Sequence, residues 1–380
     1  MKSVALITEY NPFHNGHVFH AQQAKQLTQA DVTIAIMSGS FVMRGEPAIY
    51  NKFTRATMAL DQCDLVVELP AFASLSAGEY FGDMAVQLAH YLDSDALVFG
   101  SESGDTDAFL SISQQLNDLK ARPIFQQKIK EGKSYPRILS ELFPNESLLV
   151  SPNDTLGLSY VRAIQQHNYQ MTPYAIHRQN SHHHDQTLTQ SSIASGSAIR
   201  HAMTHDNPEW QHAVPASVQH LYTAPHIDKA DTFPYLKYTI LSQSTEALSE
   251  IYTMSEGLEY RLKKVILEAQ SFDHLIQLLK SKRYTYTHLQ RVLMNTLLQF
   301  KQQDRPETIP AARILGMTPQ GQQYLKELKH KFSDRHWITN VNQQNASLIA
   351  QNIHATRIYN LISSQQQDDF NTPVIRSNAH

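Results

Sequence analysis

Two histidines and a glycine follow a short apolar run near the N-terminus of this chain. The segment reads TEYNPFHNGH and lies between an expected strand and an expected helix. Gly16 lets a phosphate approach the backbone closely, and free N–H groups at the start of a helix favour an anion. The imidazoles of His14 and His17 can donate hydrogen bonds to phosphate oxygens as charge develops at phosphorus. The motif therefore indicates displacement at a phosphate without a covalent enzyme intermediate.

A second run of small polar residues, SGSAIR at 195–200, opens another expected helix. Hydroxyl and N–H groups at a helix start can hold the β- and γ-phosphates of a nucleotide. Arg200 can neutralise a leaving pyrophosphate. The alternative is an ordinary serine N-cap. Its pairing with the histidine motif in one domain favours phosphate binding.

Strands and helices alternate through the first hundred residues. This alternation is typical of βαβ units and predicts an α/β domain with a parallel sheet. The histidine motif then lies at the carboxyl end of a strand, where open α/β sheets bind ligands. We expect strands over 4–8, 32–37, 65–69, 96–99 and 172–177, helices over 17–27, 52–61, 77–92 and 198–203, mostly helix over 105–145, and a polar loop over 179–192.

Composition points to a globular protein of about two domains, since the chain has 380 residues, 41% hydrophobic and 18% charged. The single cysteine, Cys63, excludes a disulfide framework within the chain and any cysteine-based zinc finger. No apolar run approaches the roughly 20 residues that span a bilayer, and the N-terminal apolar run is short for a signal peptide. We therefore expect a cytoplasmic protein with no membrane partner.

Charge is distributed unevenly between the two parts of the chain. Residues 1–224 carry 14 Lys and Arg against 21 Asp and Glu, whereas residues 225–380 carry 18 against 14. The second part shows no clear strand, and we expect helices over 235–252, 258–269, 272–280, 287–302 and 320–331. It also holds the densest basic and aromatic cluster, which predicts a nucleic-acid surface, the alternative being a solvated helix end. The cluster comprises Lys280, Lys282, Arg283, Tyr284, Tyr286 and Arg291.

Two further basic residues, Arg44 and Lys52, lie in the segment between the second expected strand and the next helix. They could close over phosphates or meet a nucleic acid, and an ordinary surface loop is the alternative. His14, His17 and His20 are spaced three apart, but no carboxylate or cysteine at ligand spacing completes a metal site. We expect no protein-bound metal, and Mg²⁺ only as a companion of ATP held by phosphates and water.

The histidine motif resembles that of the HxGH nucleotidyltransferase superfamily. His14, Gly16 and His17 match it, whereas Glu9 and Asn11 depart from its usual residues. A closer resemblance, spread from residue 5 to about 330, is to the bacterial tRNA(Met) cytidine acetate ligase family. The runs that carry it are EYNPFHNGH, MSGSFVMRGEPA, DLVVELP, FGSE, SPNDTLG, SEGLE and KSKRYT.

The family resemblance implies a Rossmann-like, HUP-type nucleotidyltransferase domain over 1–224 and an α-helical tRNA-binding domain over 225–380. It implies an enzyme that activates acetate with ATP as acetyl-adenylate, releasing pyrophosphate. The acetyl group then passes to N4 of the wobble cytidine of elongator tRNA(Met), giving N4-acetylcytidine.

The same resemblance implies three groups of residues. His14 and His17 would be catalytic. The ATP site would comprise Ile7, Thr8, Glu9, Tyr10, Asn11, Pro12, Phe13, Asn15, Gly16, His20, Gly100, Asn153, Arg178, Ser195, Ser197 and Arg200. The tRNA would meet Arg44, Lys52, Lys280, Lys282, Arg283 and Arg291.

Two other functions fit parts of these observations. One is an HxGH nucleotidyltransferase that acts on a small phosphorylated metabolite and makes no use of the basic cluster. The other is a non-catalytic RNA-binding protein that kept the fold. The sequence leaves the acetate-pocket residues and the oligomeric state open.

Overall fold

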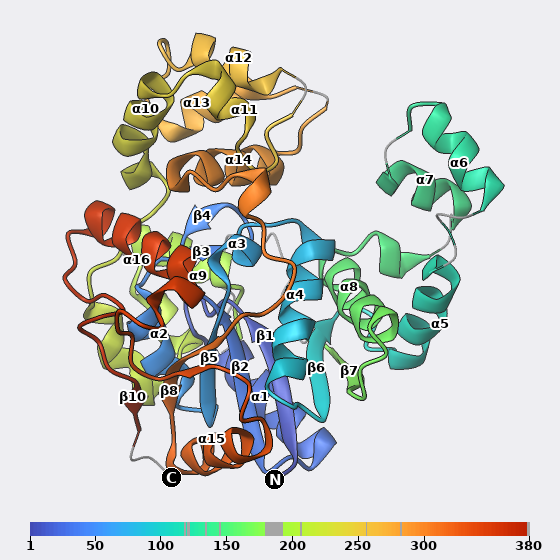
Figure 1. The fold of residues 1–380 in the computed structure, drawn as a ribbon, viewed down its shortest axis with the longest axis vertical. Helices are drawn as coiled ribbons and strands as arrows, with labels where there is room; N and C mark the ends of the chain where they lie inside the picture. Colours follow the sequence, from blue (N-terminus) through green and yellow to red (C-terminus); the bar gives the residue numbers. More distant parts are fainter. Residues whose placement is uncertain are drawn as a thin grey trace.

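The computed structural model describes residues 1–117, 119, 122–133, 135–143, 146–178, 193–205, 207–255, 257–281 and 283–377. A sheet covered by helices forms the body of the molecule (Figure 1). A helical domain stands over the carboxyl ends of its strands, and a small helical arm projects from one side. The expected loop over 179–192 lies outside the described residues.

The central sheet has the strand order β10-β8-β5-β2-β1-β6-β7. Five consecutive strands, β5-β2-β1-β6-β7, are parallel and are the five that the sequence predicts, so the α/β fold class is confirmed. The apolar runs of β1, β2, β5 and β6 are buried because helices cover both faces of the sheet, whereas β7 lies at its edge and is only partly buried. The five strands are β1 (Ser3–Thr8), β2 (Val32–Ser38), β5 (Leu65–Leu69), β6 (Ala96–Ser101) and β7 (Thr172–His177).

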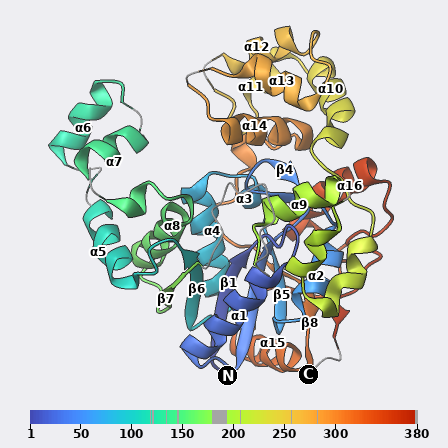
Figure 2. The same cartoon turned by 180° about the vertical axis from the view of Figure 1, so that it is seen from behind.

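Alternate residues of β1 enter two different cores, as the two-residue period of a strand requires. Ala5 belongs to the core beneath α4 (Gly78–Tyr91) and α8 (Pro152–Gln166). Val4 and Leu6 belong to the core on the opposite face. The helices there are α1 (Asn15–Thr28), α2 (Lys52–Ala59) and α9 (Gly196–Thr204), which Figure 2 shows in front of the sheet.

The hydrophobic core of the helical domain includes Leu236, Leu262, Phe272 and Leu293, and it continues into Phe72 and Tyr359 of the sheet-bearing part. The single helix expected over 235–252 is two helices, because the backbone is extended at Gln243 and the Ser244 side chain caps a new start. The domain comprises α10 (Phe233–Ser242), α11 (Thr245–Ser249), α12 (Leu258–Val265), α13 (Phe272–Leu279) and α14 (Tyr286–Leu298).

After α14 the chain returns to the sheet. β8 (Ala312–Met317) pairs antiparallel with β5, and β9 (Trp337–Ile338) and β10 (Ile375–Arg376) pair parallel with β8. The expectation of a strand-free part after residue 225 is therefore wrong for these three segments. A six-residue segment with Arg313 as its second residue has no clear strand periodicity, and only the pairing with β5 decides. α15 (Pro319–Lys331) matches its predicted range, and α16 (Ala350–Ser363) was not predicted.

The remaining elements are short. β3 (Phe41–Val42) and β4 (Glu46–Pro47) form a hairpin after β2, and α3 (Ala71–Ser74) follows β5. The arm carries α5 (Thr106–Asn117), α6 (Pro123–Lys130) and α7 (Tyr135–Leu142), so the helical expectation for 105–145 is confirmed.

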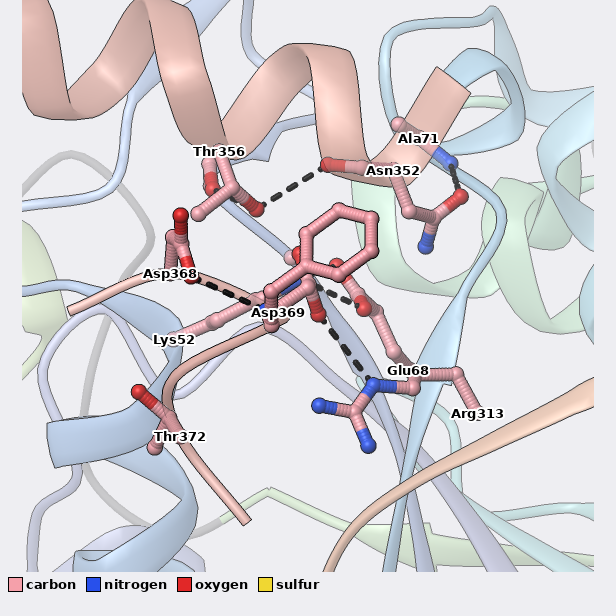
Figure 3. A network of polar contacts seen from close by, with 12 residues as sticks. Lys52, Glu68, Ala71, Arg313, Asn352, Thr356, Asp368, Asp369 and Thr372 are labelled. Carbon is pink, nitrogen blue, oxygen red and sulfur yellow. Dashed lines mark hydrogen bonds and ion pairs between the residues drawn. The ribbon is translucent and has the colours of Figure 1, made fainter. Parts of the chain in front are cut away.

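A buried ionic network ties the end of the chain to the sheet (Figure 3). Lys52 Nζ lies 2.8 Å from Glu68 Oε2 and 2.8 Å from Asp369 Oδ2. Arg313 Nε donates to Asp369 Oδ1 at 3.1 Å. All four side chains are at most 1% exposed. The expectation that Lys52 contacts tRNA is therefore wrong, because its ammonium group is enclosed and paired with two carboxylates.

Candidate active site

A cavity of about 270 Å³ opens at the carboxyl ends of β1, β6 and β7. Segments far apart in sequence meet there: the loop before α1, the β3–β4 turn, the starts of α8 and α9, and the end of β7. The predicted site residues that line it are Ile7, Thr8, Glu9, Tyr10, Asn11, His14, Gly16, His17, His20, Gly100, Asn153, Arg178, Ser195, Ser197 and Arg200. Arg44, expected at tRNA, lines the same cavity.

The two motif histidines are locked into one tautomer by the helix start. His14 is the N-cap of α1, and its Nδ1 accepts a hydrogen bond from Gly16 N at 3.1 Å. His17 Nδ1 accepts one from His14 N at 3.2 Å. The rings stack with centroids 3.7 Å apart. Because each Nδ1 is an acceptor, each Nε2 carries the proton and is a donor.

Both imidazoles are neutral. Burial, together with the neighbouring cations Arg178 and Arg200, lowers the pKa of His14 to about 3. Burial and the neighbouring His14 bring the pKa of His17 well below its ordinary value. The site therefore offers neutral N–H donors to phosphate oxygens, and its positive charge comes from arginines.

Gly16 has a different role from the expected one. Its N–H is bonded to His14 Nδ1 and does not stand free for an anion. A Cβ at this position would meet His14 Cε1 at 2.9 Å and Nδ1 at 3.0 Å. The glycine thus makes room for the imidazole ring.

The arginine of the second motif fastens the two motifs together. Arg200 Nη1 donates to Asn11 O at 2.6 Å, and its Nη2 lies 3.3 Å from Glu46 Oε1. The Ser195 side chain caps α9 by accepting from Ala198 N at 3.1 Å. The cap and the phosphate-binding interpretations of this run are therefore compatible, since Ser195 caps the helix and still lines the cavity.

Glu9 is a carboxylate that lines the cavity just before the histidine loop. Its Oε1 accepts from Met43 N at 2.8 Å. Burial raises its pKa, and Arg44 and Arg200 oppose that shift. Arg44 Nη1 lies 3.5 Å from Ser197 Oγ across the cavity. The β3–β4 turn is thereby held against both motifs.

A second cationic wall stands at the ends of β6 and β7. Arg178 Nη1 lies 3.5 Å from Asn153 Oδ1, and Asn153 Nδ2 donates to Glu102 Oε1 at 2.5 Å. A Cβ at Gly100 would meet Arg178 Cγ at 3.3 Å, so the glycine lets the arginine lie across the strand end. Gly100, Asn153 and Arg178 are brought together as expected.

Three predicted ATP residues do not line the cavity. Phe13 is buried beneath the loop, where its ring meets Tyr10 edge-on at 4.9 Å and its carbonyl accepts from Tyr222 Oη. Pro12 is buried beside it. Asn15 Nδ2 donates to His212 O at 3.0 Å. Their contacts are those of residues that shape the loop.

The basic residues of the helical domain separate into two places. Lys280 and Arg283 are exposed where the chain passes from α13 to α14, and Lys282 lies outside the described residues. Arg291 Nη1 donates to Met43 O at 3.2 Å. A Cβ at Gly45 would lie 2.4 Å from Arg291 N. α14 therefore packs directly on the turn that carries Arg44.

The cavity also has apolar walls that sequence reasoning missed. A signal existed for two of these residues, because Leu156 and Tyr160 follow Asn153 by three and seven positions on one helix face. The others come from elements whose packing the sequence does not reveal. The missed residues are Phe19, Met43, Phe81, Phe99, Leu156, Tyr160, Ile176, His177, Ile193 and Gly196.

Within the described ranges, no group of three or more His, Cys, Asp or Glu side chains could hold a metal ion. None of the described helices combines the length and apolarity needed to cross a membrane.

The fold, the paired histidines and the arginine-lined cavity define a nucleotidyltransferase of the HIGH type, and the HIGH Nucleotidyl Transferase family model matches residues 1–372. The tRNA(Met) cytidine acetate ligase of Staphylococcus saprophyticus is 59% identical over 99% of this chain and 100% of that protein. That of Staphylococcus carnosus is 57% identical over 99% and 98%. The chain belongs to the tRNA(Met) cytidine acetate ligase family, as the sequence motifs indicate.

Solved structures agree with this membership. Thermotoga maritima TmcAL without ligand has a TM-score of 0.90 at 25% identity, covering 99% of this chain and 100% of that one. A second structure of the same protein, bound with alpha-thio ATP, has a TM-score of 0.87 at 25% identity, covering 99% of each chain.

Proposed function

We propose that this protein activates acetate with ATP and transfers the acetyl group to N4 of the wobble cytidine of elongator tRNA(Met), in the cytoplasm. One observation carries the proposal. The cavity joins His14 and His17 to Arg44, Arg178 and Arg200 in a chain that matches its relatives from end to end. Acetate, Mg²⁺ and the choice of tRNA are parts of the proposal.

In the first step, an acetate oxygen attacks the α-phosphorus of ATP. The bond from that phosphorus to the bridging oxygen breaks, and pyrophosphate leaves with the electron pair. No proton is transferred, so the protein needs only to align the reactants and stabilise the developing charge. His14 and His17 donate through Nε2, and Arg178 and Arg200 neutralise the phosphates. Mg²⁺ bound to ATP would be held by phosphate oxygens and water.

In the second step, N4 of cytidine attacks the acetyl carbon. AMP leaves with the electron pair of the C–O bond, and N4 loses one proton. The base must leave its stack to reach the cavity. The helical domain stands over the carboxyl ends of the strands, where the cavity opens, so RNA bound to it would lie close to the acetyl-adenylate (Figure 1).

Pyrophosphate release from ATP, with and without acetate and before any tRNA is added, tests the first step. We expect release that depends on acetate. If acetate alone gives no release, the assay is repeated with elongator tRNA(Met). Pyrophosphate release that depends on neither acetate nor tRNA, or only on a phosphorylated metabolite, would favour a nucleotidyltransferase that acts on a small metabolite.

Removing two cations from the helical domain tests the tRNA surface. Lys280→Ala combined with Arg283→Ala should weaken tRNA binding and reduce the slope of log K against log salt by about 1.5 to 2, because two phosphate contacts are lost. Filter binding at several salt concentrations measures both quantities. Lys326→Ala with Lys329→Ala on α15, at the opposite end of the molecule, is the matched control. An equal loss of tRNA affinity in both double variants would show that Lys280 and Arg283 have no specific role in tRNA binding.

A further inference from the structure

The walls of the cavity belong to two different cores. Tyr10 belongs to the core under α1 and α9, the helices that begin with the two phosphate motifs, and Ile176 packs against it. Phe81 and Tyr160 belong to the core under α4 and α8, and Met43 and Leu156 pack against that core. One side of the cavity is therefore polar and cationic, and the other is a wall of aromatic and aliphatic side chains.

Close helix packing brings this wall together. A Cβ at Gly82 of α4 would lie 2.2 Å from Ser159 Oγ of α8, so the two helix backbones meet at this point. The next residue along α8 is Tyr160, and the preceding residue along α4 is Phe81. Both are almost fully buried, at 3% and 2% exposed, yet both line the cavity. The wall is thus rigid and contributes little open surface.

Tyr160 carries a polar atom that the protein leaves without a partner. Its hydroxyl makes no hydrogen bond to any residue within the described ranges. The residue is only 3% exposed, and it lines the cavity. The hydroxyl is not one of the fully enclosed polar atoms, so its hydrogen-bonding capacity is open to a molecule in the cavity. Burial raises its pKa, and the Glu9 carboxylate raises it further, so the hydroxyl stays protonated and is a donor.

We propose that this wall is the acyl subsite. The Tyr160 hydroxyl donates a hydrogen bond to a carboxylate oxygen of the acid, and Phe81 with Met43 encloses its methyl group and limits the acid to a short chain. The carboxylate then faces the arginines and the α-phosphorus. This inference rests on the proposed function, because it names where the activated acid sits.

ATP–pyrophosphate exchange without tRNA, driven by acetate, propionate or butyrate, tests the subsite. Tyr160→Phe keeps the ring and removes only the donor, and we expect the KM for acetate to rise about tenfold with the affinity for ATP unchanged. Phe81→Ala enlarges the subsite. It should raise the ratio of kcat/KM for butyrate to that for acetate at least tenfold. Phe81→Leu should shift the ratio in the same direction by less.

Tyr238→Phe is the matched control, since this tyrosine is 73% exposed on α10 and touches no part of the cavity. Direct ATP binding confirms that each variant is folded. An unchanged KM for acetate in Tyr160→Phe, together with an unchanged order of acids in both Phe81 variants, would overturn the subsite. Failure of the wild-type protein to exchange with any acid, both without and with elongator tRNA(Met), while it binds ATP, would instead overturn the proposed function.

Discussion

Replacing either motif histidine should slow adenylate formation by about 10²- to 10³-fold, the loss typical of one preorganised donor to a developing charge. Each imidazole is held by a backbone hydrogen bond to its Nδ1 and is neutral, so each supplies one fixed N–H donor. His14→Ala and His17→Ala should both show this loss in acetate-dependent pyrophosphate release. Affinity for tRNA should change little, because neither residue belongs to the helical domain.

His14→Asn separates the catalytic role from the structural one. Asparagine is a good N-cap and can still accept from the Gly16 N–H, so α1 should keep its stability. The slow adenylation should nevertheless persist, because the imidazole Nε2–H is gone. His330→Ala, on the exposed face of α15, controls for loss of a histidine elsewhere. If His14→Asn restored the rate, His14 would be only a helix cap. If either alanine variant lost tRNA affinity instead, the motif would bind RNA.

The histidine site was predictable because its parts are local in sequence. His14, Gly16 and His17 share one helix start, and their spacing alone specifies the geometry. Arg178 and Gly100 needed the family resemblance, since they meet only through β6 and β7. Tyr160 escaped prediction because an aromatic residue two turns into a helix is more often core, and here it is both core and cavity wall.

Asp369→Ala should destabilise the fold by about 3 to 5 kcal/mol, because it leaves two buried cations with a single carboxylate. Lys52 and Arg313 both contact Asp369, and all three side chains are enclosed. Urea unfolding at neutral pH measures the loss. Burial acts to raise the pKa of Asp369, but the two cations outweigh it and hold the pKa below its usual range. This contribution to stability is therefore present at neutral pH and is lost as the pH falls through that lowered pKa.

Asp368→Ala is the neighbouring control. Asp368 accepts from Phe370 N and Asn371 N, each at 2.9 Å, and contacts neither cation. Its loss should cost about 1 kcal/mol, the worth of an ordinary turn contact. Equal losses for the two variants would mean that the turn, and not the ionic network, holds the end of the chain.

The fold was predictable where each helix or strand carries its own pattern, as in β1, β2 and α4. It was not predictable where a residue depends on distant partners. The sequence suggests that Lys52 is a surface charge, because its partners Glu68 and Asp369 are 16 and 317 positions away. The sequence does not predict β8 as a strand, because its six residues form one only when they pair with β5.

Because β8 pairs with β5, the sheet cannot assemble in the order in which its strands are synthesised. As the chain leaves the ribosome, β5 is an open edge until residues 312–317 emerge, and Lys52 has only Glu68 as a carboxylate partner until Asp369 follows. An unpaired strand edge invites pairing with other chains, and nascent proteins generally fold from the N-terminus first. The catalytic half of this enzyme therefore stays incomplete until β8 and Asp369 have been made, long after its own strands.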